Sequence, residues 1–131
     1  MQESRPFLVH GQWKSGERLA PVVDPFTGKL VAQVTQATES DVDEAIASTC
    51  SAAITMGQLP AHARYNMLQQ IAALLYRRRD EVAQTITAEA GKPITDAKRE
   101  VSRAIQTFTV AAEEARRIPG EIVPLDWTPG F

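Results

Sequence analysis

The chain has 131 residues, the usual size of one domain and enough to bury an ordinary hydrophobic core. Its 14 lysines and arginines and 16 aspartates and glutamates give a formal net charge of -2, which excludes the strongly basic surface of a nucleic-acid-binding protein. No run approaches the roughly 20 apolar residues of a membrane span, and residues 1–6 lack the apolar run of a secretory signal. The sequence therefore predicts a soluble, cytoplasmic protein without nucleic-acid or membrane partners.

The single cysteine, Cys50, excludes an internal disulfide bond and a metal site built from several cysteines. It lies among apolar residues of a segment with helical periodicity, so we expect a small buried side chain rather than a nucleophile. His10 and His62 are far apart in the sequence and fit no metal-ligand spacing. The sequence therefore predicts no metal site.

The first third of the chain is extended and rich in turns. Residues 7–9 and Trp13 flank Gly11 and predict a short hairpin. A second hairpin is predicted from strands at residues 21–23 and 30–34, because the segment between them contains the proline and glycine that a tight reversal needs.

Helical periodicity begins at Thr38. Thr38 and Asp41 match the capping-box pattern, in which a hydroxyl and an acid three residues later satisfy backbone groups at the start of a helix. Apolar residues follow at three- and four-residue steps, and Gly57 is the predicted stop of this first helix.

Two further helices are predicted from the same periodicity. One runs from Pro60 to Gly91, and the other begins near Ile94 and is broken by Pro119. Lys92, between Gly91 and the next proline, is expected to be a basic residue that stabilises the exposed carbonyls at a helix end.

The predicted organisation is a helix-rich α+β chain with two early hairpins. Residues 1–37 form the hairpin region, residues 38–120 a three-helix segment, and residues 121–131 an extended exit. Three helices with broad apolar faces must bury those faces against other residues. They either pack on one another as a bundle or lie on a sheet from residues outside this chain, and periodicity leaves both arrangements open.

A series of short motifs runs through nearly the whole chain. In order, they are Asp24-Pro25-Phe26-Thr27-Gly28, Ser40-Asp41-Val42-Asp43-Glu44-Ala45, Arg79-Asp80-Glu81-Val82-Ala83, Glu89-Ala90-Gly91-Lys92-Pro93 and Gly120-Glu121-Ile122-Val123-Pro124. No single motif is diagnostic, but their order resembles the amino-terminal segment of the NAD(P)-dependent aldehyde dehydrogenases.

This resemblance implies an enzyme that oxidises an aldehyde to a carboxylic acid through a cysteine thiohemiacetal, with NAD or NADP as hydride acceptor. The chain resembles the opening strands and the helices that lead into the α/β Rossmann-type cofactor domain of such an enzyme. The family's nucleophile, general base and cofactor-binding groups would follow Phe131. We therefore expect no catalytic and no cofactor-binding residue in this segment, no catalytic domain, and no activity or bound cofactor for residues 1–131 alone.

Three residues are candidates for substrate contact, each by resemblance. Arg103 looks like the position at which family members acting on anionic aldehydes carry an arginine that faces the substrate tunnel, and such an arginine would bind a phosphate or carboxylate through paired hydrogen bonds. Thr107 and Phe108, one turn later, are expected near the same tunnel. The alternatives are a solvated Arg103 paired with Glu100 or Gln106, and core packing for Phe108. Arg103 and the exit at Pro124 favour the branch that oxidises glyceraldehyde 3-phosphate, lactaldehyde or a semialdehyde.

A different class of function stays open from the sequence. The chain is alternatively a stand-alone interaction or assembly module, whose exposed helix faces bind a partner, or a truncated product with no role of its own. The expected partners are accordingly the rest of the dehydrogenase, or a self-associating copy of the chain, and a small aldehyde substrate.

Overall fold

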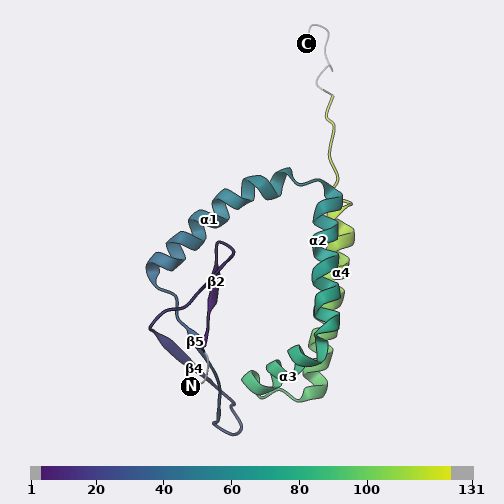
Figure 1. The fold of residues 1–131 in the computed structure, drawn as a ribbon. Helices are drawn as coiled ribbons and strands as arrows, with labels where there is room; N and C mark the ends of the chain where they lie inside the picture. The colour runs from purple at the N-terminus through teal and green to yellow at the C-terminus, as the bar shows by residue number, and fades with distance from the viewer. Residues whose placement is uncertain (1–3, 125–131) are drawn as a thin grey trace.

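The structure is a computed structural model that describes residues 4–124, and these form five strands followed by four helices (Figure 1). The strands are β1 (Ser4–Arg5), β2 (Phe7–Val9), β3 (Gln12–Lys14), β4 (Leu19–Val23) and β5 (Leu30–Thr35). The helices are α1 (Glu39–Gln58), α2 (Ala61–Arg77), α3 (Arg79–Ala90) and α4 (Ile94–Ala115). The predicted helix-rich α+β class is confirmed. Of the predicted exit segment, residues 125–131 lie outside the described residues.

The first predicted hairpin is confirmed. Strands β2 and β3 pair antiparallel, with Leu8 opposite Trp13. The two residues of the turn, His10 and Gly11, have positive φ angles of 51° and 71°. Two positive φ angles are what a tight two-residue hairpin turn requires, because its twist then matches that of the strands.

The second hairpin is also confirmed, and it belongs to a three-stranded sheet in the order β1-β5-β4. Strands β4 and β5 pair antiparallel, and the Asp24 carboxylate closes their turn by accepting hydrogen bonds from the N–H groups of Phe26 (2.8 Å) and Thr27 (2.9 Å). These backbone hydrogen bonds, that from Thr27 first, hold the pKa of Asp24 below its ordinary value. Strand β1 adds parallel to β5, which the sequence did not predict because two residues carry no pattern.

Helix α1 begins as predicted and ends later than predicted. The Thr38 hydroxyl accepts from the Asp41 N–H, and the Asp41 carboxylate accepts from the Thr38 N–H, which completes the capping box. The prediction that Gly57 stops the helix is wrong, because Gly57 lies inside it. The helix ends where Leu59 turns extended at ψ 133°, the conformation that a following proline such as Pro60 imposes.

The prediction of one long helix over residues 60–91 is also wrong, and the predicted three helices are therefore four. The backbone leaves helical geometry at Arg78 (φ -99°, ψ 13°), which separates α2 from α3. No glycine or proline marks this break in the sequence. It allows Ala83 of α3 to pack against Ala97 and Val101 of α4, a tertiary contact that a local pattern does not contain.

The junction between α3 and α4 follows the prediction. Gly91 ends α3 in the left-handed conformation (φ 64°), and Pro93 precedes the first turn of α4. At its other end α4 stops at Ala115, before the predicted break at Pro119.

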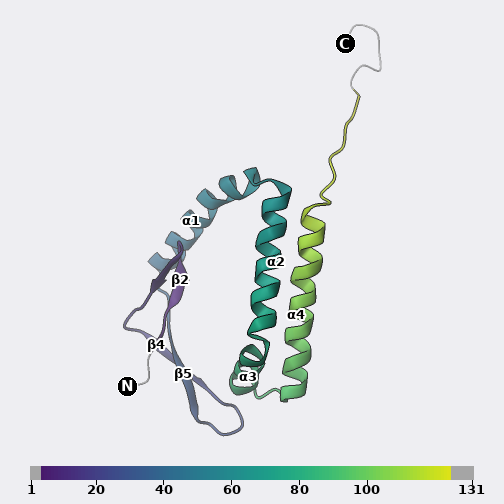
Figure 2. The same ribbon diagram turned by 45° about the vertical axis from the view of Figure 1, so that its right-hand side comes forward.

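The elements form an open arch. Figures 1 and 2 show α1 rising from the strands and curving over to the start of α2, while α2 and α4 run side by side on the far limb. The β4–β5 turn approaches the α3–α4 junction at the foot of the arch, where Pro25 lies against Gly91. Because α1 diverges from the other helices, the helices do not close into a self-contained bundle.

The core of the described residues is small and is built from small side chains. Between α3 and α4, Ala83 and Ala97 are fully buried and Val101 is 3% exposed. No large side chain among the described residues is fully buried. In α1 no residue is buried, and the apolar side chains of Ile46 and Ile54 are more than half exposed. These helices therefore have apolar faces that the described residues leave uncovered.

Candidate functional site

A hollow between α2, α3 and α4 contains two of the three predicted substrate-contact residues. Its floor is apolar and its rim is polar. The residues that line it are Leu75 of α2, Val82 and Ile86 of α3, and Glu100, Val101, Arg103, Ala104 and Thr107 of α4. The break at Arg78 builds this hollow, because it turns α3 so that Val82 and Ile86 face α4.

Arg103 lies on the rim with its side chain 78% exposed. Its nearest acidic partner is Glu100, and the Arg103 Nη2 to Glu100 Oε1 distance is 4.0 Å. This distance is too long for a hydrogen bond, so the guanidinium donors of Arg103 remain available to a ligand. An accessible guanidinium above an apolar floor suits a small organic anion.

Glu100 is held by another residue. Lys92 Nζ lies 2.5 Å from Glu100 Oε1, the same oxygen that faces Arg103. The Lys92 hydrogen bond is the largest cause that lowers the pKa of Glu100 from its ordinary value, and the charge of Arg103 adds to it. Lys92 therefore does not cap the α3 carbonyls as predicted, but bridges the α3–α4 junction to the hollow.

The other two predicted residues differ in position. Thr107 lines the hollow, and its hydroxyl donates a hydrogen bond of 3.0 Å to the carbonyl oxygen of Arg103. Phe108 is half-buried and does not line the hollow. On a helix it falls near the row of Val101 and Ala97, the face that packs against the neighbouring helices.

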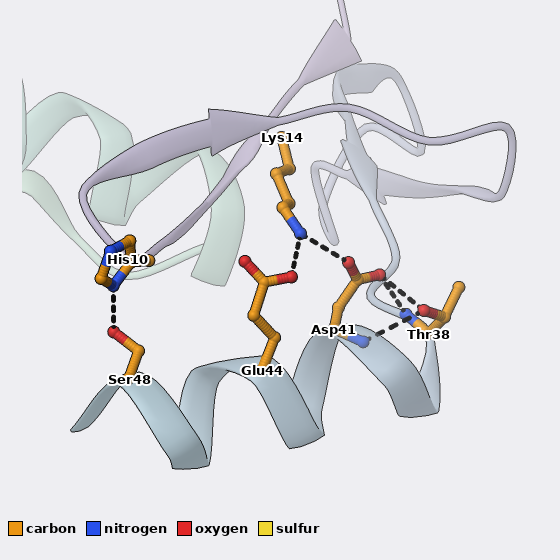
Figure 3. A network of polar contacts seen from close by, with 6 residues as sticks. All are labelled: His10, Lys14, Thr38, Asp41, Glu44 and Ser48. Atoms are coloured by element: carbon orange, nitrogen blue, oxygen red, sulfur yellow. Dashed lines mark hydrogen bonds and ion pairs between the residues drawn. The ribbon is translucent and has the colours of Figure 1, made fainter. Parts of the chain in front are cut away.

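A second polar cluster joins the β2–β3 hairpin to α1 (Figure 3). Lys14 Nζ lies 2.5 Å from Glu44 Oε2 and 3.4 Å from Asp41 Oδ1, and His10 Nδ1 lies 2.7 Å from Ser48 Oγ. The hydrogen bond to Glu44 is the largest cause that raises the pKa of Lys14. Each of these contacts joins the β2–β3 hairpin to α1, so the cluster holds the hairpin against the helix. We call it the structural tie.

Cys50 lies on α1 near this tie, and the prediction that it is buried is wrong. The side chain is exposed, because α1 diverges from the other helices and Val9 of β2, which lines the same hollow as Cys50, does not cover it. The sequence pattern around Cys50 is apolar, but none of the described residues buries its side chain.

A glycine-rich turn from a strand into a helix, a feature of dinucleotide-binding folds, does not occur in residues 4–124. The strand-to-helix turn from β5 to α1, residues 36–38, contains no glycine that would let the backbone approach a pyrophosphate. Within residues 4–124 no group of three or more His, Cys, Asp or Glu side chains is placed to hold a metal ion, and no helix is long and apolar enough to cross a membrane.

Comparison with known proteins decides the family. Residues 13–130 match the aldehyde dehydrogenase family. The chain belongs to the aldehyde dehydrogenase family. A 3-sulfolactaldehyde dehydrogenase of Priestia aryabhattai is 36% identical over 122 residues, which are 93% of this chain and 25% of that protein. The family predicted from the order of the motifs is confirmed.

Solved structures of aldehyde dehydrogenases share the fold. Aldehyde dehydrogenase 21 from Physcomitrella patens, in complex with the reaction product succinate, superimposes with a TM-score of 0.91 at 39% identity over 98% of this chain and 27% of that one. An NAD-dependent benzaldehyde dehydrogenase from Corynebacterium glutamicum gives a TM-score of 0.88 at 28% identity over 95% of this chain and 28% of that one. The chain thus spans about a quarter of the length of the aldehyde dehydrogenases that it matches.

Proposed function

We propose that this chain is the amino-terminal part of an NAD(P)-dependent aldehyde dehydrogenase that oxidises an aldehyde to a carboxylic acid through a cysteine thiohemiacetal. Membership of the family supports the reaction, and the quarter of the relatives' length that the chain spans supports a contribution from further residues. In this proposal residues 1–37 are the opening strands and residues 38–120 are the helical segment of the cofactor-binding domain. The nucleophile, base and cofactor site lie outside this segment. The proposal includes the cytoplasmic location that the composition predicts.

The role proposed for this segment is to bind the anionic end of the substrate. The accessible guanidinium of Arg103 above the apolar floor of the hollow is the observation that carries this role. Two relatives act on or release small anions: 3-sulfolactaldehyde carries a sulfonate, and succinate carries two carboxylates. Arg103 is proposed to bind such a group, with Thr107 beside it on the rim. For Phe108, substrate contact stays a prediction, and its half-buried position favours packing.

The test uses the protein at the length it has in its natural source. Its intact mass is measured, and NAD- and NADP-dependent oxidation is assayed with succinic semialdehyde and with butanal, a neutral aldehyde of the same carbon number. Arg103→Met should lower kcat/KM for succinic semialdehyde roughly 10- to 100-fold, the loss typical of a charged hydrogen-bonded contact, and leave butanal nearly unchanged. Arg99→Met is the matched control, because Arg99 lies on the same helix and pairs with Asp96 at 3.1 Å.

The outcomes separate the two parts of the proposal. If the protein oxidises no aldehyde with NAD or NADP, the proposal that it is a dehydrogenase is wrong. Oxidation with the same anion preference in Arg103→Met would contradict only the role of Arg103.

A second candidate is a stand-alone interaction module. It is favoured by the apolar groove along α2 and α4, which Met67, Leu68, Ile71, Ala111 and Ile118 help to line, and by the exposed face of α1. An intact natural mass that matches 131 residues, without dehydrogenase activity, would support this candidate, with a second copy as the first partner to test. A larger mass with activity would contradict it.

A further inference from the structure

The acid–arginine pairs along α4 provide an internal comparison. Four arginines on this helix or just after its end follow an acidic residue by three positions. In three of the four pairs the closest nitrogen–oxygen distance is 2.5 to 3.1 Å, and in the fourth it is 4.0 Å. The three close pairs are Asp96–Arg99, Glu113–Arg116 and Glu114–Arg117, and the open pair is Glu100–Arg103.

Spacing on the helix does not explain the open pair, because it is the same in all four pairs. The difference is Lys92, whose ammonium lies 2.5 Å from the Glu100 oxygen that faces Arg103. The backbone on either side of Lys92 is constrained by Gly91, in the left-handed conformation, and by Pro93, with its fixed φ. Lys92 is therefore placed to engage Glu100 from the α3–α4 junction.

We propose that Lys92 is a positioning residue for the anion site: by holding Glu100, it keeps the guanidinium of Arg103 open to the anionic group of the substrate. This inference rests on the proposed function of Arg103. Without Lys92, the Glu100 carboxylate would pair with Arg103 as closely as its three counterparts on the helix do, and it would then compete with the substrate.

The charges of the three side chains lead to the same conclusion. Lys92, Glu100 and Arg103 together carry one net positive charge, and loss of the Lys92 ammonium leaves a neutral pair. Both the competition and the lost charge weaken binding of an anion, whereas neither affects a neutral aldehyde of the same size. Lys92 therefore acts on substrate preference through Arg103.

The experiment measures kcat and KM for succinic semialdehyde and butanal with the natural-length protein. Lys92→Met should raise KM for succinic semialdehyde about fivefold, the factor that corresponds to one exposed charge pair, with kcat and both butanal constants nearly unchanged. Lys92→Arg should keep the wild-type KM, and Glu100→Gln added to Lys92→Met should restore it, because the competing carboxylate is gone. Lys98→Met is the matched control, since Lys98 pairs with Asp80 at 3.4 Å instead.

Failure of this inference can be told from failure of the proposed function. If Arg103→Met leaves the anion preference unchanged, the proposed anion site is wrong. If Arg103→Met removes the preference but Lys92→Met leaves KM unchanged, or the double variant does not restore it, the role of Lys92 is wrong.

Glu100→Gln alone keeps the inference testable if Lys92→Met does not fold. It should lower KM for succinic semialdehyde, and a higher KM would contradict the inference. If Lys92→Met lowers kcat/KM equally for succinic semialdehyde and butanal, Lys92 has a purely structural role. That result would contradict the inference as well.

Discussion

Gly91 and Pro25 are in direct contact across the foot of the arch. A Cβ atom added at Gly91 would lie 2.7 Å from Cγ of Pro25, and the backbone there has φ 64°. Both features exclude a side chain, because the proline ring does not yield easily and a positive φ disfavours any residue with a Cβ. The glycine therefore both ends α3 and allows the β4–β5 turn to reach the helices.

The first prediction is that Gly91→Ala destabilises the protein. The conformational penalty alone is about 1–2 kcal/mol, and the displacement of Pro25 adds to it. Urea unfolding of the natural-length protein measures the change. Gly57→Ala is the matched control: Gly57 lies inside α1 with nothing within 4 Å of its added Cβ, so it should be neutral or stabilising by up to about 1 kcal/mol. Equal effects of the two substitutions would contradict the role assigned to Gly91.

The capping box of α1 provides the second prediction. Thr38→Ala should destabilise the protein by about 1 kcal/mol, because it removes the hydroxyl that accepts from the Asp41 N–H. Urea unfolding checks this change. Ser51→Ala, at an exposed position within α1, is the control and should change stability by less than about 0.5 kcal/mol.

The same capping box makes the stability of the protein depend on pH. The pKa of Asp41 is lowered, first by the hydrogen bond from the Thr38 hydroxyl and then by the Thr38 N–H. A carboxyl with a lowered pKa contributes stability above its ordinary pKa of about 3.9, and this contribution is lost as the pH falls through the folded value. Thr38→Ala should raise the pKa of Asp41 toward the ordinary value, which carbon NMR of the carboxyl group would measure. An unchanged pKa would contradict this cause.

Features determined by neighbouring residues could be predicted from the sequence, and features determined by distant ones could not. The turn at Gly11, the cap at Thr38 and the stop at Gly91 depend on a few adjacent residues, and all were predicted correctly. The break at Arg78 and the exposure of Cys50 depend on where α3 and α1 lie relative to other elements. An apolar helical pattern shows that a face is to be covered but not what covers it.

The same distinction between local and distant determinants applies to the candidate site. Arg103 could be singled out by resemblance to the family, and Thr107 followed from it as a residue one helical turn later. The contact between Lys92 and Glu100 joins residues on either side of a glycine–proline junction, and its direction depends on the angle at which α3 meets α4. A basic residue after a helix is commonly a cap, so the sequence favoured the wrong partner for Lys92.

The third prediction concerns the tie between the β2–β3 hairpin and α1. Lys14→Met removes both ion pairs to α1, to Glu44 and to Asp41, so the amides of β2 and β3 should exchange with solvent faster. Hydrogen exchange at pH 7 measures this. Lys29→Met, in the β4–β5 turn, changes the same charge elsewhere and should leave the hairpin unaffected. If the β2 and β3 amides exchange at the same rate in Lys14→Met and Lys29→Met, β-strand pairing alone holds the hairpin in place.

The raised pKa of Lys14 adds a condition to this test. A base whose pKa is raised by its partners contributes stability below its ordinary pKa of about 10.4, and loses it as the pH rises through the folded value. The tie should therefore be intact at pH 7. Because the pair is exposed to solvent, added salt should weaken it, and wild-type exchange at high salt should approach that of Lys14→Met.

The last prediction connects the small core to the hollow. Ala83 is fully buried against Ala97 and Val101, and its neighbours Val82 and Ile86 line the hollow. Ala83→Leu should push α3 away from α4, with a loss of about 1–3 kcal/mol of stability from overpacking. Ala73→Leu, at an exposed position of α2, is the control and should stay within about 0.5 kcal/mol of wild type.

Ala83→Leu should also alter substrate preference, because moving α3 separates Lys92 from Glu100 at the junction that the two helices share. Released from Lys92, Glu100 would pair with Arg103 as the other acids of α4 pair with their arginines. KM for succinic semialdehyde should then rise at temperatures where the variant is still folded, and butanal should be less affected. A variant that loses stability but keeps its anion preference would show that the position of α3 does not control Arg103.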